Sequence, residues 1–564
     1  MKTTTRRTKD GTVVRYLHLA HNDWDAVAGR SKPRILFSFG RADELDRAAV
    51  ERLIGALQRL LDPAAASAAA GPVELSMLES RPVGGTHVLD ALWRRLGIDA
   101  RIRDLLSGRK LDAARVERVL FALVASRALA ASSKLAAVEW ISRDVHIDGL
   151  AEIGEQACYR AMDELLAIEP TLAEQVYFQV TDLLNLEVDL LFFDTTNTYF
   201  ELDEADVEVP RDKDGRVVTG DDPAAVTTGG FRSWGKSKDG RDDLPQVVVG
   251  MAVTRDGIPV RCWSWPGGTA DSKLIRQVKD DMRAWSLSRI VWVADRGFSS
   301  ADNRRELMRG AGGYIIGEKL RSGSEEVKAA LARPGRYRVI RENLQVKEVN
   351  IGSDDRFVLC YNPEQAIRDA AVRERLVAQL GEAIENTDRL SKTDRAKLEG
   401  VLSTKPGLKR FLRVTPGGLL RIDKKKIDAE ENLDGKYLLR SSDPKLSAED
   451  IALGYKQLLE VERGWRDMKQ VLDMRPIYHR LEDRIRAHVL LCWLGLLLMR
   501  VAENTSGQTW KRIRTELDRL HAVTFAGPAG TFRQTTEPTK PQRDLFTALG
   551  VDLPKRVQDA NPAS

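Results

Sequence analysis

The stretch "VDLLFFDTTNTYFE" runs from Val188 to Glu201 and joins a long apolar run to a carboxylate and several small polar residues. Its run Leu190-Leu191-Phe192-Phe193 has no polar interruption, which predicts a strand buried on both faces of a sheet. The run ends at Asp194. A charge at the end of a buried strand is costly unless another group pairs with it. We therefore expect a partner for Asp194.

The residues that follow predict a mixed sheet. "PQVVVGMAVTRDGIPVRCWSWPG" reads as two strands, joined by a hairpin turn at Arg255-Asp256-Gly257. The amphipathic stretch "SKLIRQVKDDMRAW" predicts a helix, and "RIVWVAD" predicts a second apolar strand that ends at Asp295. A helix from about Ser300 and a strand, "GGYIIGEKL", complete the run. The predicted fold class is α/β.

The pattern along the chain predicts five parts. They are a small N-terminal α+β region with a linker (1–72), a helical segment (73–186), a catalytic α/β core in two pieces (187–320 and 447–505), an inserted subdomain (321–446), and a partly disordered C-terminal tail (506–564). The helical segment carries recurrent arginines. Either it is a helix-turn-helix type DNA-binding domain, or the arginines lie on the solvated faces of a helical bundle.

Composition describes an ordinary globular protein with a modest basic excess. Apolar residues make up 43% and charged residues 30%, and 88 Lys+Arg stand against 83 Asp+Glu. This balance permits an anionic partner without requiring one. The four cysteines form no CxxC pair, which favours a reducing compartment over a zinc module or disulfide framework. The longest apolar run, "VLLCWLGLLLM" (489–499), is too short to span a bilayer and predicts a buried core helix. We expect a cytoplasmic protein with no membrane partner.

Two carboxylates at the ends of neighbouring apolar strands point to a metal site. Asp194 and Asp295 would repel each other if held close together, and a divalent cation removes that repulsion. Mg²⁺ takes a few hard oxygen ligands and keeps waters that a phosphate can replace. The stretch "AEDIALGYKQLLEVERGWRDMKQVLDM", opened by a capping box at "SAED", predicts one long helix. Its residues Tyr455, Glu462 and Lys469 are spaced seven apart and would share one helix face. Glu462 is the candidate third carboxylate.

These three segments carry a resemblance to a known family. "FFDTTNTYF", "VWVADRGFSSADNRREL" and "YKQLLEVERGWRDMK" resemble the three acidic motifs of bacterial insertion-sequence DDE transposases, which have a ribonuclease-H-like core and a Tyr-Arg-Glu-Lys signature. Tyr455, Glu462 and Lys469 match the signature, whereas Leu458 stands at the position of its Arg. The resemblance covers roughly residues 186–490, including a long insertion before the Glu. It implies a ribonuclease-H-like mixed sheet interrupted by the inserted subdomain and preceded by a mainly helical N-terminal region.

The resemblance also implies an activity. The protein would cut double-stranded DNA at terminal inverted repeats and join the 3′-hydroxyl ends to target DNA, in a prokaryotic cytoplasm at the nucleoid and as a homodimer on the DNA. Asp194, Asp295 and Glu462 would hold two Mg²⁺ ions, with Mn²⁺ as a substitute, for phosphoryl transfer. The expected DNA contacts are Tyr455, Lys469, Arg466, Arg463, Lys236 and Arg241.

Other interpretations stand beside this one. Asp194 and Asp295 could each form local turn hydrogen bonds, since polar residues follow both. A glycoside hydrolase could use two of the three carboxylates, although the chain lacks the repeated units of a barrel. The protein could also be a catalytically inactive or repurposed DNA-binding derivative of a transposase. His479 and His488 near the third motif are interpreted as structural residues.

Overall fold

The computed structural model describes residues 2–562 apart from 8–12, 26–29, 44, 46–47, 49, 51, 55–56, 58–74, 151, 185, 187–188, 214, 220–221, 271–272, 286–289, 311, 322 and 528–529. The linker expected before residue 73 lies outside the described residues. The chain divides into two compact units. Unit 1 comprises residues 1–186 and 465–564, and unit 2 comprises residues 187–464.

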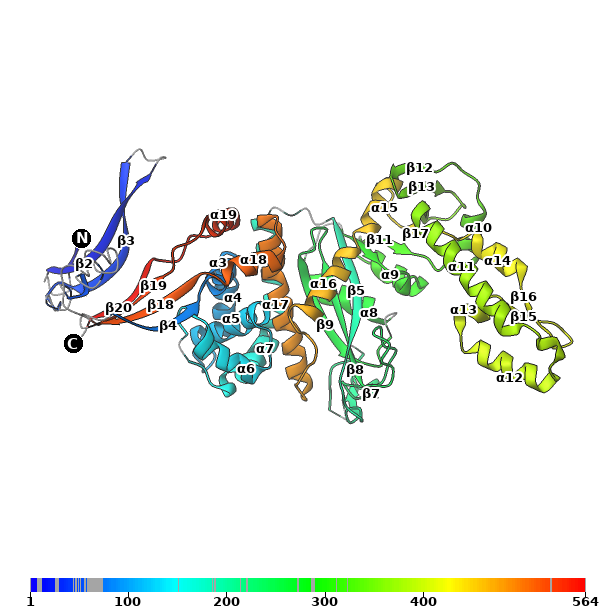
Figure 1. The fold of residues 1–564 in the computed structure, drawn as a ribbon, viewed down its shortest axis with the longest axis horizontal. Helices are drawn as coiled ribbons and strands as arrows, with labels where there is room; N and C mark the ends of the chain where they lie inside the picture. The colour runs from blue at the N-terminus through cyan, green and yellow to red at the C-terminus, as the bar shows by residue number, and fades with distance from the viewer. Residues whose placement is uncertain are drawn as a thin grey trace. The chain divides into compact units, whose positions relative to one another are not determined.

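Unit 2 is built on a nine-stranded mixed sheet, drawn mainly in greens in Figure 1, with the order β12-β13-β14-β17-β11-β10-β5-β8-β9. The strands β5 and β10 pair in parallel, as do β10 and β11, whereas the other neighbours pair antiparallel. The bounds are β5 Leu190–Tyr199, β8 Gln246–Val253, β9 Pro259–Pro266, β10 Val291–Ala294, β11 Gly313–Gly317, β12 Arg338–Arg341, β13 Leu344–Val349, β14 Arg356–Tyr361 and β17 Lys436–Ser441. The predicted mixed α/β sheet is confirmed.

The apolar runs make this sheet because both of its faces are covered. Every residue of β8 and the first four of β5 are buried. The turn at 255–257 joins β8 and β9 as predicted, with Gly257 at a φ of +73°. Along the chain, α8 (Leu274–Asp281) connects β9 to β10, and α9 (Ala301–Met308) connects β10 to β11. The Ser300 side chain caps α9 by accepting a hydrogen bond from the Asn303 amide.

The expected inserted subdomain is only partly separate. Its strands β12, β13, β14 and β17 extend the core sheet, because β17 pairs with β11. The other part has its own core, formed by Leu380, Leu402, Phe411 and Leu420. Its elements are α11 Pro363–Ile384, η5 Thr387–Arg389, α12 Lys392–Ser403, α13 Pro406–Lys409, β15 Leu412–Val414, β16 Leu420–Ile422 and α14 Lys424–Glu431. Smaller elements of unit 2 are β6 Val209–Arg211, β7 Thr227–Gly229, η3 Arg283–Trp285, η4 Arg296–Phe298 and α10 Glu325–Ala332.

The long helix expected after Ser447 is two helices. The predicted capping box is present at Ser447 and Asp450 and opens α15 (Ala448–Lys456). The helix then breaks, because the amides of Gln457 and Leu458 bond to carbonyls three residues back, and α16 begins at Leu459 (Leu459–Gln470). The expectation that Tyr455, Glu462 and Lys469 share one continuous helix face is therefore wrong.

Unit 1 is a helical cluster around one apolar helix. The helix α17 (Glu482–Ser506) packs against α5 (Ala113–Leu129) and α7 (Glu155–Leu183). By length and composition α17 could cross a membrane, but 94% of its most apolar window is buried, as expected for a core helix. It was expected in the catalytic core, but it belongs to unit 1. The neighbouring elements are α3 Gly84–Arg95, α4 Ile98–Leu106, α6 Lys134–Glu139, the π-helix η1 Trp140–Asp144 and α18 Trp510–Leu517.

The N-terminus is not mainly helical. Before α3 the chain forms β1 (Lys2–Arg7), β2 (Val13–Asp25) and β3 (Arg30–Arg41), which pair as an antiparallel sheet, and then β4 (Ser76–Pro82). The helices of residues 84–183 come after these strands. The expectation of a mainly helical N-terminal region therefore describes only its second half.

The C-terminal tail is folded, contrary to expectation. Strands β18 (His521–Gly527), β19 (Gly530–Thr535) and β20 (Val557–Pro562) form a sheet with β4. The helix α19 (Lys540–Leu549) begins at a capping box on Thr539 and buries Leu545, Phe546 and Leu549. Residues 536–539 connect β19 to α19, and residues 559–562 lie within β20.

Candidate active site

Parallel pairing places Asp194 and Asp295 next to each other. In the register of β5 and β10, Phe193 lies opposite Ala294, so the next residues along are Asp194 and Asp295. Asp194 still belongs to β5, and Asp295 is the first residue after β10. The two carboxylates interact, since the charge of Asp295 contributes to raising the pKa of Asp194. The neighbouring placement expected from the sequence is confirmed for these two acids.

The surroundings of Asp194 raise the pKa of its carboxyl group. Burial raises its pKa, and the repulsion from Asp295 acts in the same direction. Lys238 and the hydrogen bond from the Thr195 amide oppose this shift. The side chain of Asp194 is 21% exposed, so one side of the carboxylate remains accessible.

Lys238 is the partner that Asp194 has in this fold. Its Nζ lies 3.4 Å from Asp194 Oδ1 and donates to the carbonyl and hydroxyl oxygens of Thr195 at 2.6 and 2.7 Å. Of the loop cations chosen from the sequence, Lys236 is exposed, and Arg241 pairs with Asp243 at 2.8 Å and lies over the ring of Tyr199. Sequence reasoning did not select Lys238, because mixed charges in one loop do not show which of them turns inward.

Tyr455 lies at the second carboxylate. Its hydroxyl donates to Asp295 Oδ1 at 3.4 Å, and burial together with the charge of Asp295 raises the pKa of the phenol. Gly317 leaves room for this ring, because a Cβ there would lie 2.4 Å from the Tyr455 hydroxyl. The signature tyrosine is thus a neutral donor to Asp295.

Glu462 differs from the two aspartates in its position on the protein surface. It is exposed in the first turn of α16. Among the residues that the structure describes, no group of three or more His, Cys, Asp or Glu side chains is gathered as a metal site. The two aspartates have the hard oxygen donors that Mg²⁺ takes, so the residues fit a divalent cation with two protein ligands in place.

The other residues proposed around the third motif lie on both sides of residues 464 and 465, where unit 2 ends and unit 1 resumes along the chain. Arg463 lies 3.7 Å from Glu460 in unit 2, while Arg466, which is exposed, and Lys469 belong to unit 1. Leu458, at the position of the signature Arg, falls in the break between α15 and α16. Their contact with DNA stays a prediction.

Local capping does not account for the two aspartates. Asp295 directly precedes η4 but makes no side-chain capping bond to it. Asp194 lies inside a strand that continues to Tyr199, not in a turn. The sheet of unit 2 is open, with β12 and β9 at its edges, which differs from the barrel that the glycosidase hypothesis needs.

The arginines of the helical segment are mostly engaged within unit 1. Arg94 and Arg118 pair with Asp90, Arg103 pairs with Asp99, and Arg109 pairs with Glu164. Arg101 and Arg115 are exposed. This pattern supports solvated or salt-bridged faces of a bundle more than a prepared DNA-reading surface.

Comparison with known proteins identifies two regions of the chain. Residues 202–499, more than half of the chain, match the family model described as the transposase DDE domain. Residues 1–68 match the N-terminal domain of IS1634 family transposases. No curated protein matches. Among solved structures, a piggyBac transposase synaptic complex with hairpin DNA is similar, with 13% identity, a TM-score of 0.33 and coverage of 76% of each chain.

Proposed function

Because this chain belongs to the family of transposases with a DDE domain, we propose that Asp194, Asp295 and Glu462 are its catalytic carboxylates. The protein is a DNA transposase. In our proposal it cuts at the terminal inverted repeats of an insertion sequence and joins the 3′-hydroxyl ends to target DNA, on the nucleoid of a prokaryotic cell. The placement of Asp194 and Asp295 side by side, the first within β5 and the second directly after β10, carries the proposal.

The core around these acids supports a ribonuclease-H-like arrangement. Strands β5, β8 and β9 form an antiparallel meander, and β10 and β11 add to β5 in parallel. The parallel pairing of β5 with β10 brings Asp194 and Asp295 together from distant parts of the sequence. We take this order as the basis for a ribonuclease-H-like core.

The carboxylates would hold two Mg²⁺ ions, for which Mn²⁺ could substitute. Glu462 would join Asp194 and Asp295 as the third carboxylate ligand when DNA is bound. When bound, such ions activate a hydroxyl nucleophile and neutralise charge on the scissile phosphate. Lys238 keeps the charge of Asp194 compensated before a cation arrives. Tyr455 occupies one oxygen of Asp295 and so fixes the orientation of that carboxylate.

The protein surface around the acids would meet the DNA backbone. Arg463, Arg466, Lys469, Lys236 and Arg241 are the proposed phosphate contacts. Cutting at both ends of one element requires two active sites, which is why we propose a homodimer in the DNA complex.

Nicking of supercoiled plasmid tests the site. Wild type should nick only with Mg²⁺ or Mn²⁺, and Asp194→Ala, Asp295→Ala and Glu462→Ala should each lose nicking at least about a hundredfold, since a charge-stabilising group is removed. Asp354→Ala, an exposed acid of the same unit, is the matched control and should nick normally. Metal-dependent nicking that persists in Asp194→Ala would refute the assignment.

A second candidate function rests on Glu462. Since its carboxylate is not gathered with the two aspartates among the described residues, a catalytically inactive DNA-binding derivative is the alternative. This protein would shift terminal-repeat DNA in a gel without nicking it at any metal concentration. Wild-type nicking excludes this alternative, whichever acid serves as the third ligand.

A further inference from the structure

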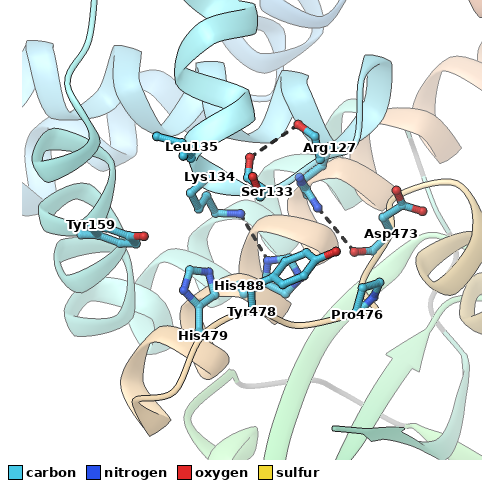
Figure 2. A pocket seen from close by; sticks show the side chains of 11 residues that line it. Arg127, Ser133, Lys134, Leu135, Tyr159, Asp473, Pro476, Tyr478, His479 and His488 are labelled. Carbon is cyan, nitrogen blue, oxygen red and sulfur yellow. Dashed lines mark hydrogen bonds between the residues drawn. The ribbon is translucent and has the colours of Figure 1, made fainter. Parts of the chain in front are cut away.

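A cavity of about 330 Å³ lies entirely within unit 1, whereas Asp194, Asp295 and Glu462 belong to unit 2. It is formed where α5, α6 and α7 meet the segment between α16 and α17. Six of its lining residues matter here: Arg127, Lys134, Tyr159, Tyr478, His479 and His488. Figure 2 shows the nitrogen atoms of Lys134 and Arg127 directed toward one central space, near the rings of His488 and Tyr478. Tyr478 is 71% exposed, so the cavity opens to solvent on that side.

The floor of the cavity holds two buried cations. Arg127 is 2% exposed and Lys134 is 5% exposed. Two nitrogens of Arg127, Nε and Nη2, are buried without a hydrogen-bond partner, and the third makes only long contacts of 3.4 Å to the carbonyls of Leu472 and Asp473. In Figure 2 Asp473 turns its carbonyl, and not its carboxylate, toward Arg127. A buried guanidinium in this state carries a large desolvation cost.

Two other buried arginines, Arg500 and Arg440, are compensated by acids. Arg500 is fully buried in the same unit and pairs with Asp467 and Glu503. Arg440 in unit 2 is 2% exposed and pairs with Glu318, Glu326 and Asp355. Within the described part of the chain, no carboxylate forms an ion pair with Arg127 or Lys134. The cavity therefore differs from the buried charge clusters that stabilise the fold.

Lys134 makes one hydrogen bond to the imidazole of His488 and, among the described residues, keeps its other N–H donors unused. His488 Nε2 lies 3.2 Å from the Met474 carbonyl, so this nitrogen carries the proton and Nδ1 accepts from Lys134 Nζ at 3.3 Å. That contact uses one of the three N–H donors of Lys134. The ring of His479 packs against those of His488 and Tyr159, which fixes it at the cavity wall.

We propose that this cavity binds a phosphate group, which supplies the negative charge that Arg127 and Lys134 lack. Asp473 also lines the cavity and its charge raises the pKa of Arg127, but within the described residues its carboxylate forms no ion pair with that guanidinium. Two buried cations with unused N–H donors and no ion-paired carboxylate are suited to a compact oxyanion. The volume equals that of roughly ten waters at about 30 Å³ each, which leaves room for a phosphate and part of its hydration shell. The phosphate is either free inorganic phosphate or the monoester at the 5′ end of a DNA strand.

The ionisation of the cavity residues supports this assignment. Burial and the charge of Arg127 lower the pKa of Lys134 to about 7, and burial lowers that of His479 to about 4 and that of His488 well below its usual value. Cys158 and Cys492 are the other titratable groups that act on Lys134. A bound anion would favour the charged lysine, so phosphate binding should strengthen as pH falls through about 7.

Isothermal titration calorimetry of the full-length protein tests the proposal. Inorganic phosphate should give a binding signal with the wild type that potassium chloride at equal ionic strength does not give. Lys134→Met should bind at least about tenfold more weakly, because a charge-assisted hydrogen bond is lost. Its thermal midpoint without phosphate should not fall, since an uncompensated buried charge is removed, whereas a purely structural lysine would give a lower midpoint. Lys511→Met, the same charge change at an exposed site on α18, is the matched control.

Two further titrations identify the source of the phosphate. In the first outcome, a 5′-phosphorylated oligonucleotide binds more tightly than the same oligonucleotide with a 5′-hydroxyl, and inorganic phosphate displaces it. This result assigns the site to the end of a DNA strand. Equal binding of both oligonucleotides, with no displacement, assigns it to free phosphate. The proposal is overturned if the wild type binds neither ligand above the chloride control. It is also overturned if Lys134→Met binds phosphate as tightly as the wild type. All the cavity residues belong to unit 1, so the result is independent of the catalytic carboxylates.

Discussion

Burial raises the pKa of Asp194, and the ammonium group of Lys238 opposes this effect. It lies 3.4 Å from Oδ1 and lowers a pKa that burial has raised. A cation binds the ionised carboxylate, so metal-dependent nicking should fall as pH drops through the pKa of Asp194. Removing Lys238 raises that pKa further, and the acidic limb of the pH profile should then move to higher pH.

The pH profile of Mg²⁺-dependent nicking in Lys238→Met measures this shift. Lys236→Met removes a neighbouring exposed loop lysine and should keep the wild-type profile. If both variants titrate like the wild type, Lys238 does not act on the carboxylate in the working enzyme.

Packing beside the site leaves no space for a methyl group on β8. A Cβ at Gly250 would lie 2.5 Å from Trp265 Cζ3 and 3.2 Å from Phe193 Cε2, and both rings are buried. We expect Gly250→Ala to destabilise the protein by about 1–3 kcal/mol, the usual cost of overpacking. Gly400→Ala in α12, where an added Cβ meets nothing within 4 Å, should instead stabilise by about 0.5–1 kcal/mol. Urea unfolding midpoints compare the two variants; equal midpoints would contradict the packing argument.

At the scale of elements, α15 carries Tyr455 to Asp295, and its start is fixed by the capping box at Ser447. The Ser447 hydroxyl accepts from the Asp450 amide, and Asp450 in turn accepts from the Ser447 amide. Ser447→Ala should weaken the first turn by about 1 kcal/mol.

Amide hydrogen exchange in residues 448–451 reports this change directly. Thr509 is the matched control, because it stands before α18 without a side-chain capping bond and Thr509→Ala should leave exchange there unchanged. Unaltered exchange in Ser447→Ala would mean that packing on the sheet, and not the cap, holds the helix start.

The whole molecule consists of unit 1, which the chain leaves after residue 186 and re-enters at residue 465, and of unit 2, which is formed in between. The C-terminal segment belongs to unit 1. Arg95 donates to the Leu549 carbonyl at 2.7 Å, and Gln542 donates to the Glu516 carbonyl at 2.8 Å. Leu545, Phe546 and Leu549 are at most 2% exposed.

Deleting residues 536–564 should therefore destabilise unit 1. Each fully buried Leu or Phe side chain contributes at most about 1.5–3 kcal/mol, and the deletion removes three. Thermal unfolding and limited proteolysis at residues 84–183 measure the effect, with deletion of Ala563 and Ser564 alone as the control. A deletion variant as stable as the full chain would restore the interpretation of this segment as a tail.

Several features followed from local patterns in the sequence. The apolar run before Asp194, the hairpin at Asp256-Gly257, the serine caps at 300 and 447, and the buried helix at 489–499 are each set by neighbours within a few residues. Periodicity and capping report whether a residue is buried and where an element begins. They were enough to place Asp194 and Asp295 on neighbouring strands, although β5 continues past Asp194 to Tyr199.

Long-range packing settled the rest. Periodicity does not say which surface covers an apolar face, so the pairing of β17 with β11 and the position of α17 in unit 1 could not be derived from it. The same holds for Lys238 at Asp194, a contact across 44 residues of chain. The cavity also joins segments far apart in the chain, since Lys134 contacts His488 across 354 residues. A linear pattern contains no information about the acids that Arg127 and Lys134 lack.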